Sequence, residues 1–139
     1  MSSVNIGDSI DPFYRYRRPR ALCNYGKNKT TIIINLDDIA KALHTKPSYI
    51  LYYIQLEKST SITSSTKKQP EIKMVLPVPE IEKLINNFIE KYILCTVCQY
   101  PELVIKQYKS ELEFSCEACG NTMPISRDKF TKIIYKDYE

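Results

Sequence analysis

The clearest periodic pattern in the chain is an apolar stripe that begins just after residue 77. Its apolar residues recur at the i, i+3, i+4 and i+7 spacing of an amphipathic helix. They are Val78, Ile81, Leu84, Ile85, Phe88 and Tyr92. Pro79 suits the first helical turn, and Glu80 and Glu82 suit the positive end of the helix dipole. The pattern predicts a helix that leads directly into Cys95.

Strand-like patterns precede and follow two shorter helical patterns in the sequence. The β-branched run Thr30–Asn35 follows a turn-like segment, Asn24–Lys29, which predicts two strands joined by a turn within residues 21–36. Further along, residues 59–69 read as a polar loop with a weak strand at 60–63. Residues 71–76 read as another strand.

Two short helices are predicted between these strands. The first is capped by Asn35 or Asp37 and carries apolar residues at helical spacing. Pro47 ends it or opens the second helix, which runs from Ser48 to about Glu57. The inward-facing positions predicted for the two helices are Ile39, Ala42 and Leu43, then Ile50, Tyr53 and Ile54. His44, the one histidine, is interpreted as a C-terminal cap or a surface residue.

Four of the five cysteines form two CxxC pairs separated by residues 99–115. This spacing is typical of a four-cysteine zinc site. The stretches 103–106 and 113–115 alternate well enough to form a hairpin that returns the second pair to the first, and Gly120 permits a positive φ there. The predicted ligands are Cys95, Cys98, Cys116 and Cys119.

With all four positions filled by thiolates, the predicted zinc ion is structural rather than catalytic. Two unrelated buried pairs, or a redox CxxC, are the alternative. Cys23 is predicted to be a small core residue. The sequence thus predicts an α+β fold: a flexible N-terminal arm (residues 1–20), a small mixed α/β core (21–92), a four-cysteine zinc ribbon (93–127) and a C-terminal tail (128–139).

Composition and the absence of certain motifs limit the class of protein but do not identify its function. The chain has 139 residues, a net charge of +4 and 43% hydrophobic residues, which allow a packed core and permit contact with RNA or an acidic partner. No leader sequence or apolar span is visible, which predicts a soluble, cytoplasmic protein without a membrane partner. The absence of a GxxxxGK[ST] loop and of a nucleophile–base pair argues against an independent enzyme.

Before the core lies an aromatic and basic segment with two interpretations. Arg15, Arg17, Arg18 and Arg20 are interleaved with aromatic residues from Phe13 onward. One interpretation is a solvated tail that binds RNA or acidic protein. The other is an arginine finger, a guanidinium supplied to a partner's nucleotide during phosphoryl transfer.

Residues 11–19, which contain the run Phe-Tyr-Arg-Tyr, resemble the opening of the eukaryotic translation initiation factor 5 family. The similarity continues through most of the chain. It includes residues 34–36, 39–43, 88–92, 94–98 and 116–120. The FYRY segment and the ribbon are the specific motifs, and the order and spacing of the others support them.

This resemblance implies a GTPase-activating protein for the γ subunit of initiation factor 2. The activation would take place in the complex with initiator tRNA and the small ribosomal subunit, with GTP and magnesium only on the partner GTPase. Arg15 would be the catalytic arginine, supplied in trans. The β subunit of factor 2 is a further expected partner, and the chain would be a monomer outside the complex. The expected binding residues are Phe13, Tyr14, Tyr16, Arg17 and Arg18.

The sequence departs from the family pattern at several places. Thr30 stands where the family has a lysine, with Lys29 adjacent as a substitute catalytic residue, and Tyr52 replaces a second lysine. Nothing corresponds to the family's C-terminal helical-repeat domain. The two replaced lysines bear on the rate of activation more than on the binding site.

Two rival functions remain open. The β subunit of factor 2 resembles residues 43–56 about as well, but residues 1–12 carry no apolar stripe for its docking helix. A non-catalytic binding module of the initiation complex is therefore the alternative. A zinc-ribbon transcription factor with a helix-turn-helix is less favoured, because residues 50–54 are too apolar to read bases.

Overall fold

A four-stranded antiparallel sheet lies at the centre of the computed structural model, which describes residues 3–6, 16–65 and 68–138. The strand order is β3-β4-β6-β5. The strands are β3 (Cys23–Gly26), β4 (Thr30–Ile33), β5 (Ile62–Ser65) and β6 (Lys68–Ile72). The two predicted strands before residue 36 are confirmed, and the later pair lies slightly displaced from its predicted bounds.

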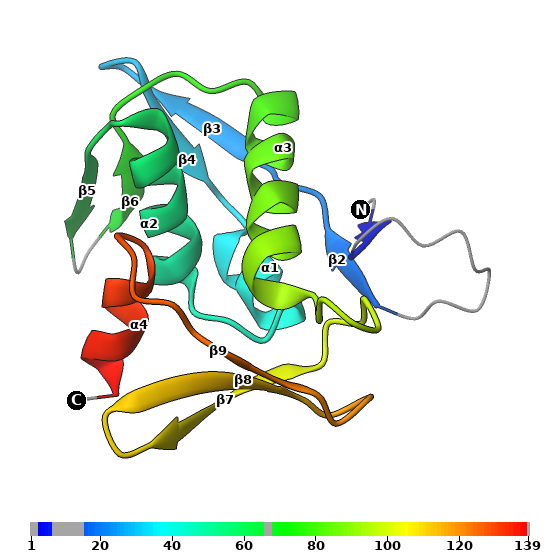
Figure 1. Cartoon of the computed structure of the whole chain (residues 1–139). Coiled ribbons are helices and arrows are strands. Elements are labelled where there is room, and N and C mark those ends of the chain that lie inside the picture. Colours follow the sequence, from blue (N-terminus) through cyan, green and yellow to red (C-terminus); the bar gives the residue numbers. More distant parts are fainter. Residues whose placement is uncertain (1–2, 7–15, 66–67, 139) are drawn as a thin grey trace.

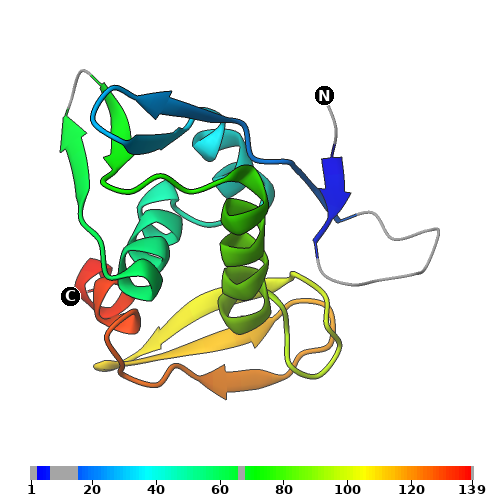
Figure 2. The ribbon, with the colours of Figure 1, turned by 90° about the horizontal axis from the view of Figure 1, so that it is seen from above.

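Helices pack against this sheet in the order that the periodicity predicts. They are α1 (Leu36–Ala42), α2 (Pro47–Lys58) and α3 (Val78–Phe88), and α3 continues into a π-helical turn, η1 (Ile89–Ile93). Figures 1 and 2 show α2 and α3 side by side on one face of the sheet. The stripe of α3 is buried at Ile81, Leu84, Ile85 and Phe88, while Val78 at its start is exposed. Pro47 opens α2 as its first residue.

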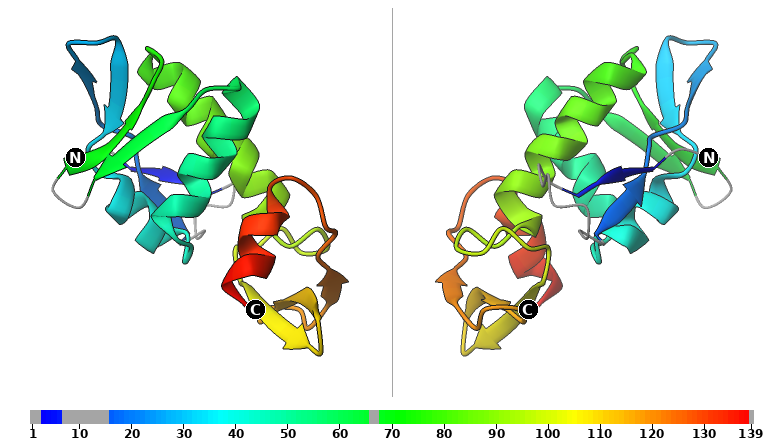
Figure 3. Two further views of the ribbon diagram at one scale, coloured as in Figure 1. Left: turned by 90° about the vertical axis from the view of Figure 1, so that its left-hand side faces the viewer. Right: turned by 90° about the vertical axis from the view of Figure 1, so that its right-hand side faces the viewer.

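The second sheet is the ribbon. It is a three-stranded antiparallel sheet in the order β7-β8-β9, made of β7 (Leu103–Tyr108), β8 (Glu111–Cys116) and β9 (Thr122–Pro124). The hairpin β7–β8 follows the prediction, whereas β9 was not predicted. Figure 3 shows the ribbon beyond the C-terminal end of α3. The α+β architecture with a cysteine ribbon is therefore confirmed.

The segment predicted as a C-terminal tail contains a helix, α4 (Thr131–Asp137). It packs beside α2 and η1 through the preceding residue, Phe130. The Phe130 ring stacks on Tyr52 of α2 with centroids 6.0 Å apart and on Tyr92 of η1 with centroids 4.3 Å apart. Asp137 Oδ2 accepts a hydrogen bond from the Tyr49 hydroxyl at 2.6 Å and forms an ion pair with Lys46 at 3.0 Å. The period of so short a helix is hard to read from sequence, because its stability comes from this packing.

Asn35 occupies the N-cap position of α1, as predicted, but its side chain does not cap the helix. Its Oδ1 accepts the Leu22 N–H at 2.9 Å, and its Nδ2 donates to the Arg20 carbonyl at 2.7 Å. The buried amide thus satisfies backbone groups of the segment that enters β3. Within the described part of the chain, no helix has both the length and the apolar character needed to cross a membrane.

Candidate functional site

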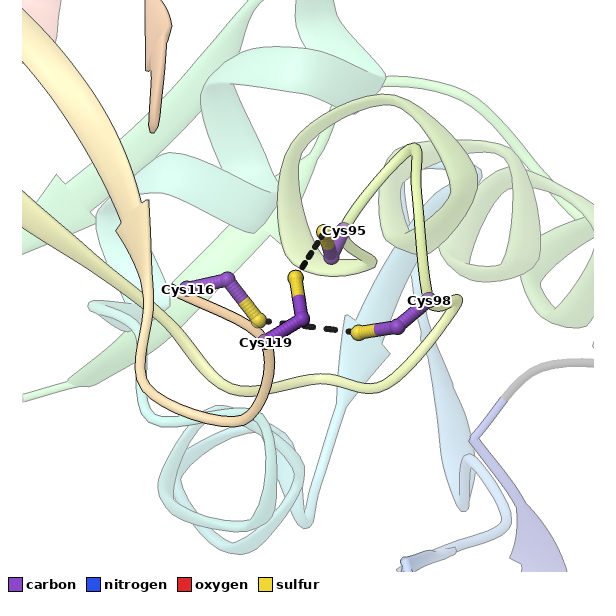
Figure 4. Close-up of side chains that lie close together, drawn as sticks. All are labelled: Cys95, Cys98, Cys116 and Cys119. Carbon is purple, nitrogen blue, oxygen red and sulfur yellow. Dashed lines mark hydrogen bonds between the residues drawn. The ribbon is translucent and has the colours of Figure 1, made fainter. Parts of the chain in front are cut away.

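Four cysteine sulfurs converge between the end of α3 and the ribbon (Figure 4). All four Sγ atoms lie within 4.8 Å of one another. The Sγ atoms of Cys95 and Cys119 are 3.7 Å apart, and those of Cys98 and Cys116 are 3.6 Å apart. A zinc ion with Zn–S bonds of about 2.3 Å needs tetrahedral edges of about 3.8 Å. The cluster therefore has the dimensions of a four-thiolate metal site.

The two CxxC turns are built alike. In the first, the Cys95 N–H donates to the Tyr100 carbonyl at 3.1 Å and the Gln99 N–H donates to the Cys95 carbonyl at 2.9 Å. The second repeats both bonds, from Cys116 to Asn121 and from Gly120 to Cys116, each at 2.9 Å. The residue after each pair has a positive φ, 64° at Gln99 and 78° at Gly120. The predicted role of Gly120 is confirmed, and an ordinary residue occupies the equivalent position in the first turn.

Donors around the sulfurs favour thiolates. The Val97 N–H lies 3.4 Å from Cys95 Sγ, and Asn121 Nδ2 lies 3.2 Å from Cys119 Sγ. The side-chain and backbone donors of Asn121 lower the pKa of Cys119 to about 6. Burial raises the pKa of Cys98 to about 12. A divalent cation would supply the charge that lets all four sulfurs ionise together.

A second feature lies beside α3, where residues 3–6 and 16–20 form what we call the arm base. Its strands β1 (Ser3–Asn5) and β2 (Arg17–Pro19) pair antiparallel, with Val4 opposite Arg18. Beyond the pair, the Ile6 N–H donates to the Tyr16 carbonyl at 2.8 Å, and Ile6 is only 2% exposed. These residues were expected to belong to a flexible arm, but in the structure they are joined to the body of the protein.

Arg18, which was expected to contact a partner, is buried against α3 with 1% of its surface exposed. Its Nη1 and Nη2 donate to the Glu82 carboxylate at 2.9 and 3.3 Å, and Nη2 also donates to Asn86 Oδ1 at 3.0 Å. The same carboxylate accepts the Ala21 N–H at 3.1 Å. The guanidinium is thus committed to intramolecular contacts, which replace the expected partner contact.

The remaining candidate residues, in the FYRY segment and directly after it, have three different outcomes. Tyr16 is half-buried, and its ring lies 5.7 Å from that of Tyr100 in the first CxxC turn, at an interplanar angle of 42°. Arg17 is exposed. The predicted residues Phe13, Tyr14 and Arg15 lie outside the described residues.

The structure does not bring Lys29 to the arm base. Lys29 lies in the β3–β4 turn with a φ of 58°, at the end of β3 far from β2 (Figure 1). Thr30 beside it is buried and donates to Glu71 Oε1 at 2.8 Å. Tyr52 donates its hydroxyl to the Lys129 carbonyl at 3.1 Å and stacks on Phe130. Thr30 and Tyr52, the two residues expected at family lysine positions, therefore both have structural contacts of their own.

His44 is exposed and has a φ of 55° directly after α1, which agrees with a surface position at the helix end. Cys23 is half-buried in β3, where burial and the nearby Glu82 carboxylate raise its pKa. Sequence reasoning missed Glu82, Asn86 and Tyr100 as partners of the arm base. The available signal was the i, i+4 spacing of Glu82 and Asn86, which places both on one face of α3.

Comparison with known proteins gives matches that agree on one family. A family model, described as a domain found in initiation factors 2B and 5, matches residues 7–122. Eukaryotic translation initiation factor 5 of Dictyostelium discoideum is 32% identical over 142 aligned residues, which cover 99% of this chain and 36% of that protein. The Mus musculus protein of the same name is 33% identical, covering 85% of this chain and 29% of its own length.

The factor 5 of Saccharomyces cerevisiae is 31% identical, covering 97% of this chain and 35% of its own length. The chain therefore spans about a third of the length of the curated relatives it matches.

Proposed function

The chain belongs to the family defined by the domain of initiation factors 2B and 5, and we propose that it works in translation initiation as a GTPase-activating protein for the γ subunit of initiation factor 2. The observation that carries this proposal is the similarity to initiation factor 5 over 99% of the chain, with the FYRY segment inside the matched residues. The chain would act as a regulator of a partner GTPase and not as an independent enzyme.

The proposed catalytic group is the guanidinium of Arg15, supplied in trans. GTP and magnesium reside on the partner, where the arginine would stabilise charge that develops on the transferred phosphoryl group. A planar, permanently charged guanidinium suits this task better than an ammonium group. The contacts of the arm base support the assignment, because Tyr16, the next residue along the chain, has a fixed position on the protein body.

Other residues would contribute to docking. Phe13, Tyr14, Tyr16 and Arg17 are proposed to contact the γ subunit near Arg15. Lys29 is proposed as an auxiliary group that acts at a different part of the partner, since its turn lies far from the arm base. The β subunit of factor 2, initiator tRNA and the small ribosomal subunit complete the proposed cytoplasmic complex.

Zinc is the proposed metal of the four-cysteine cluster. Four thiolates at tetrahedral spacing suit Zn²⁺, and a full set of protein ligands leaves no position for a reacting water. Zinc would therefore stabilise the fold of the ribbon, joining the end of α3 to β8.

The experiment is single-turnover GTP hydrolysis by the complex of factor 2, GTP and initiator tRNA on the small subunit. We expect the native chain to accelerate hydrolysis and Arg15→Ala to lower that acceleration by about 10³-fold or more, with complex binding nearly intact. Arg20→Ala is the matched control, because it removes the same charge from an exposed position outside FYRY. An unchanged rate with Arg15→Ala rules out the finger.

The second candidate is a non-catalytic module like the β subunit of factor 2. The description of the matching family names a second factor beside factor 5, so the family match alone is compatible with a function other than activation. The same assay separates the two functions. A β-like module would bind the γ subunit without accelerating hydrolysis, whereas a GTPase activator accelerates it at saturating concentration.

A further inference from the structure

The described residues on either side of positions 7–15 meet at one place on the protein body. Ile6 is buried at one end, and its N–H bonds the carbonyl of Tyr16 at the other end. The β1–β2 pairing continues this contact as far as Ser3 and Pro19. Arg15 directly precedes Tyr16 in the sequence. The described residue that follows Arg15 in the sequence therefore has a defined position on the protein body.

Tyr16 is in turn held by the metal-binding part of the molecule. Its ring packs on Tyr100 at a centroid distance of 5.7 Å. The carbonyl of Tyr100 accepts the N–H of Cys95, a cysteine of the cluster, at 3.1 Å. A contact between two aromatic rings is thus the link between the FYRY segment and the first CxxC turn.

A second anchor lies two residues further along. Arg18 is enclosed by α3, where Glu82 and Asn86 accept three hydrogen bonds from its guanidinium. Glu82 also accepts the N–H of Ala21, so one carboxylate binds the chain on both sides of Pro19. Tyr16 and Arg18 are therefore attached to different elements, the ribbon and α3, which restrains rotation of the segment about either contact.

We propose that Tyr100 and Glu82 are positioning residues for Arg15. By holding Tyr16 and Arg18, they would restrict where the chain can deliver the Arg15 guanidinium to the nucleotide of its partner. For its effect on GTP hydrolysis this inference rests on the proposed function. The physical gain is pre-organisation: a catalytic group that is attached to a positioned residue loses less entropy when it enters the transition state.

The test uses three variants of the ribbon. Tyr100→Ala removes the ring that Tyr16 contacts, while the backbone carbonyl that completes the CxxC turn remains. Tyr100→Phe keeps the ring. Tyr108→Ala is the matched control, because it removes a tyrosine of the same ribbon that is 62% exposed. Each variant is first checked for metal content equal to that of the native chain.

The first measurement is amide hydrogen exchange in the protein without partners. We expect Tyr100→Ala to speed exchange of the Ile6 amide about tenfold, because loss of the aromatic contact loosens the Tyr16 carbonyl that accepts it. Tyr100→Phe and Tyr108→Ala should leave that exchange rate unchanged. Native exchange in Tyr100→Ala overturns the proposed anchoring, whatever the activity.

The second measurement is single-turnover GTP hydrolysis as a function of chain concentration. We expect Tyr100→Ala to lower the maximal stimulated rate about tenfold with an unchanged half-saturating concentration, and Tyr100→Phe to restore it. A raised half-saturating concentration with a native maximal rate would make Tyr100 a docking residue and overturn the proposal.

Arg15→Ala is measured in the same assay, so that the proposed function and the positioning role of Tyr100 can be rejected independently. If Arg15→Ala keeps the native rate, the proposed function is wrong, and the role of Tyr100 in orienting Arg15 is wrong with it. The exchange data still decide whether the anchoring exists. If Arg15→Ala is defective and Tyr100→Ala has the native rate, the function stands and the positioning role is excluded.

Discussion

The guanidinium of Arg18 and the carboxylate of Glu82 form a two-point ion pair, with N–O distances of 2.9 and 3.3 Å, that joins the arm base to α3. The Arg18 side chain is fully buried, and that of Glu82 is 16% exposed. A buried pair of this kind costs desolvation energy, which its geometry must offset. It specifies where the arm base attaches, because few other positions could satisfy a buried guanidinium.

Loss of Glu82 should be far more damaging than loss of a partly exposed acidic residue on the same helix. We expect Glu82→Ala to lower the free energy of unfolding by about 3 kcal/mol, because it leaves the Arg18 charge buried without its partner. Glu80→Ala breaks an ion pair with Lys58 in which both side chains remain partly in contact with water, and it should have a much smaller effect. Urea denaturation measures both, and equal midpoints for the two variants would contradict the burial argument.

Removal of the proposed zinc ion should make the four clustered thiols reactive. We expect the native protein to show one slowly reacting thiol, from Cys23, whose pKa is raised by burial. After chelation, all five cysteines should react. Thiol titration with metal analysis measures this change. Cys116→Ala should lose the metal, whereas Cys23→Ala should retain it. A metal content unaffected by Cys116→Ala would exclude the four-thiolate site.

The two CxxC turns predict opposite effects for matched substitutions. Gly120→Ala should destabilise the ribbon by about 1 kcal/mol, because its φ of 78° disfavours an L-residue although no atom lies within 4 Å of the added Cβ. Gln99→Gly should raise stability or leave it unchanged, since it relieves the same strain at a φ of 64°. Chelator competition and thermal unfolding report both effects. Equal losses in the two variants would refute the backbone explanation.

Docking of α4 should depend on pH through Asp137. Hydrogen bonds from Tyr49 and Lys46 lower the pKa of Asp137 below its ordinary value of 3.8. A lowered folded-state pKa stabilises the protein above the unfolded-state pKa, and this stabilisation is lost as the pH falls through the folded-state value. Asp137→Asn should therefore lower the Tm by a few degrees at pH 7.

This deficit should shrink as the pH falls below 3.8 toward the lowered folded-state pKa of Asp137, where the native carboxyl also becomes protonated. Thermal unfolding across pH 3 to 7 checks the trend. Glu90→Gln, at an exposed position in η1, is the control and should show no comparable effect. A deficit of the same size at every pH in this range would show that the contact of Asp137 does not depend on its charge.

Elements with a strong local signal were predictable. The apolar stripe of α3 appears in the sequence as a helical period, and its predicted residues Ile81 to Phe88 are buried. The cysteine spacing predicted the convergence of four sulfurs, and the β7–β8 hairpin lies where the alternation placed it. The helix α4 and the strand β9 were missed, because each is short and gains its stability from packing rather than from its own pattern.

The sequence alone therefore determined which four cysteines converge, where the main helices lie and which family the chain resembles, since each is encoded by spacing between nearby residues or by motif order. Only the tertiary structure decided that Arg18 is buried while Arg17 is exposed, and that Tyr16 contacts Tyr100. Adjacent arginines have nearly identical local patterns. Their different environments arise from Glu82 and Asn86, 64 and 68 residues away. Contacts over such separations depend on how complete elements pack, and no short pattern specifies them.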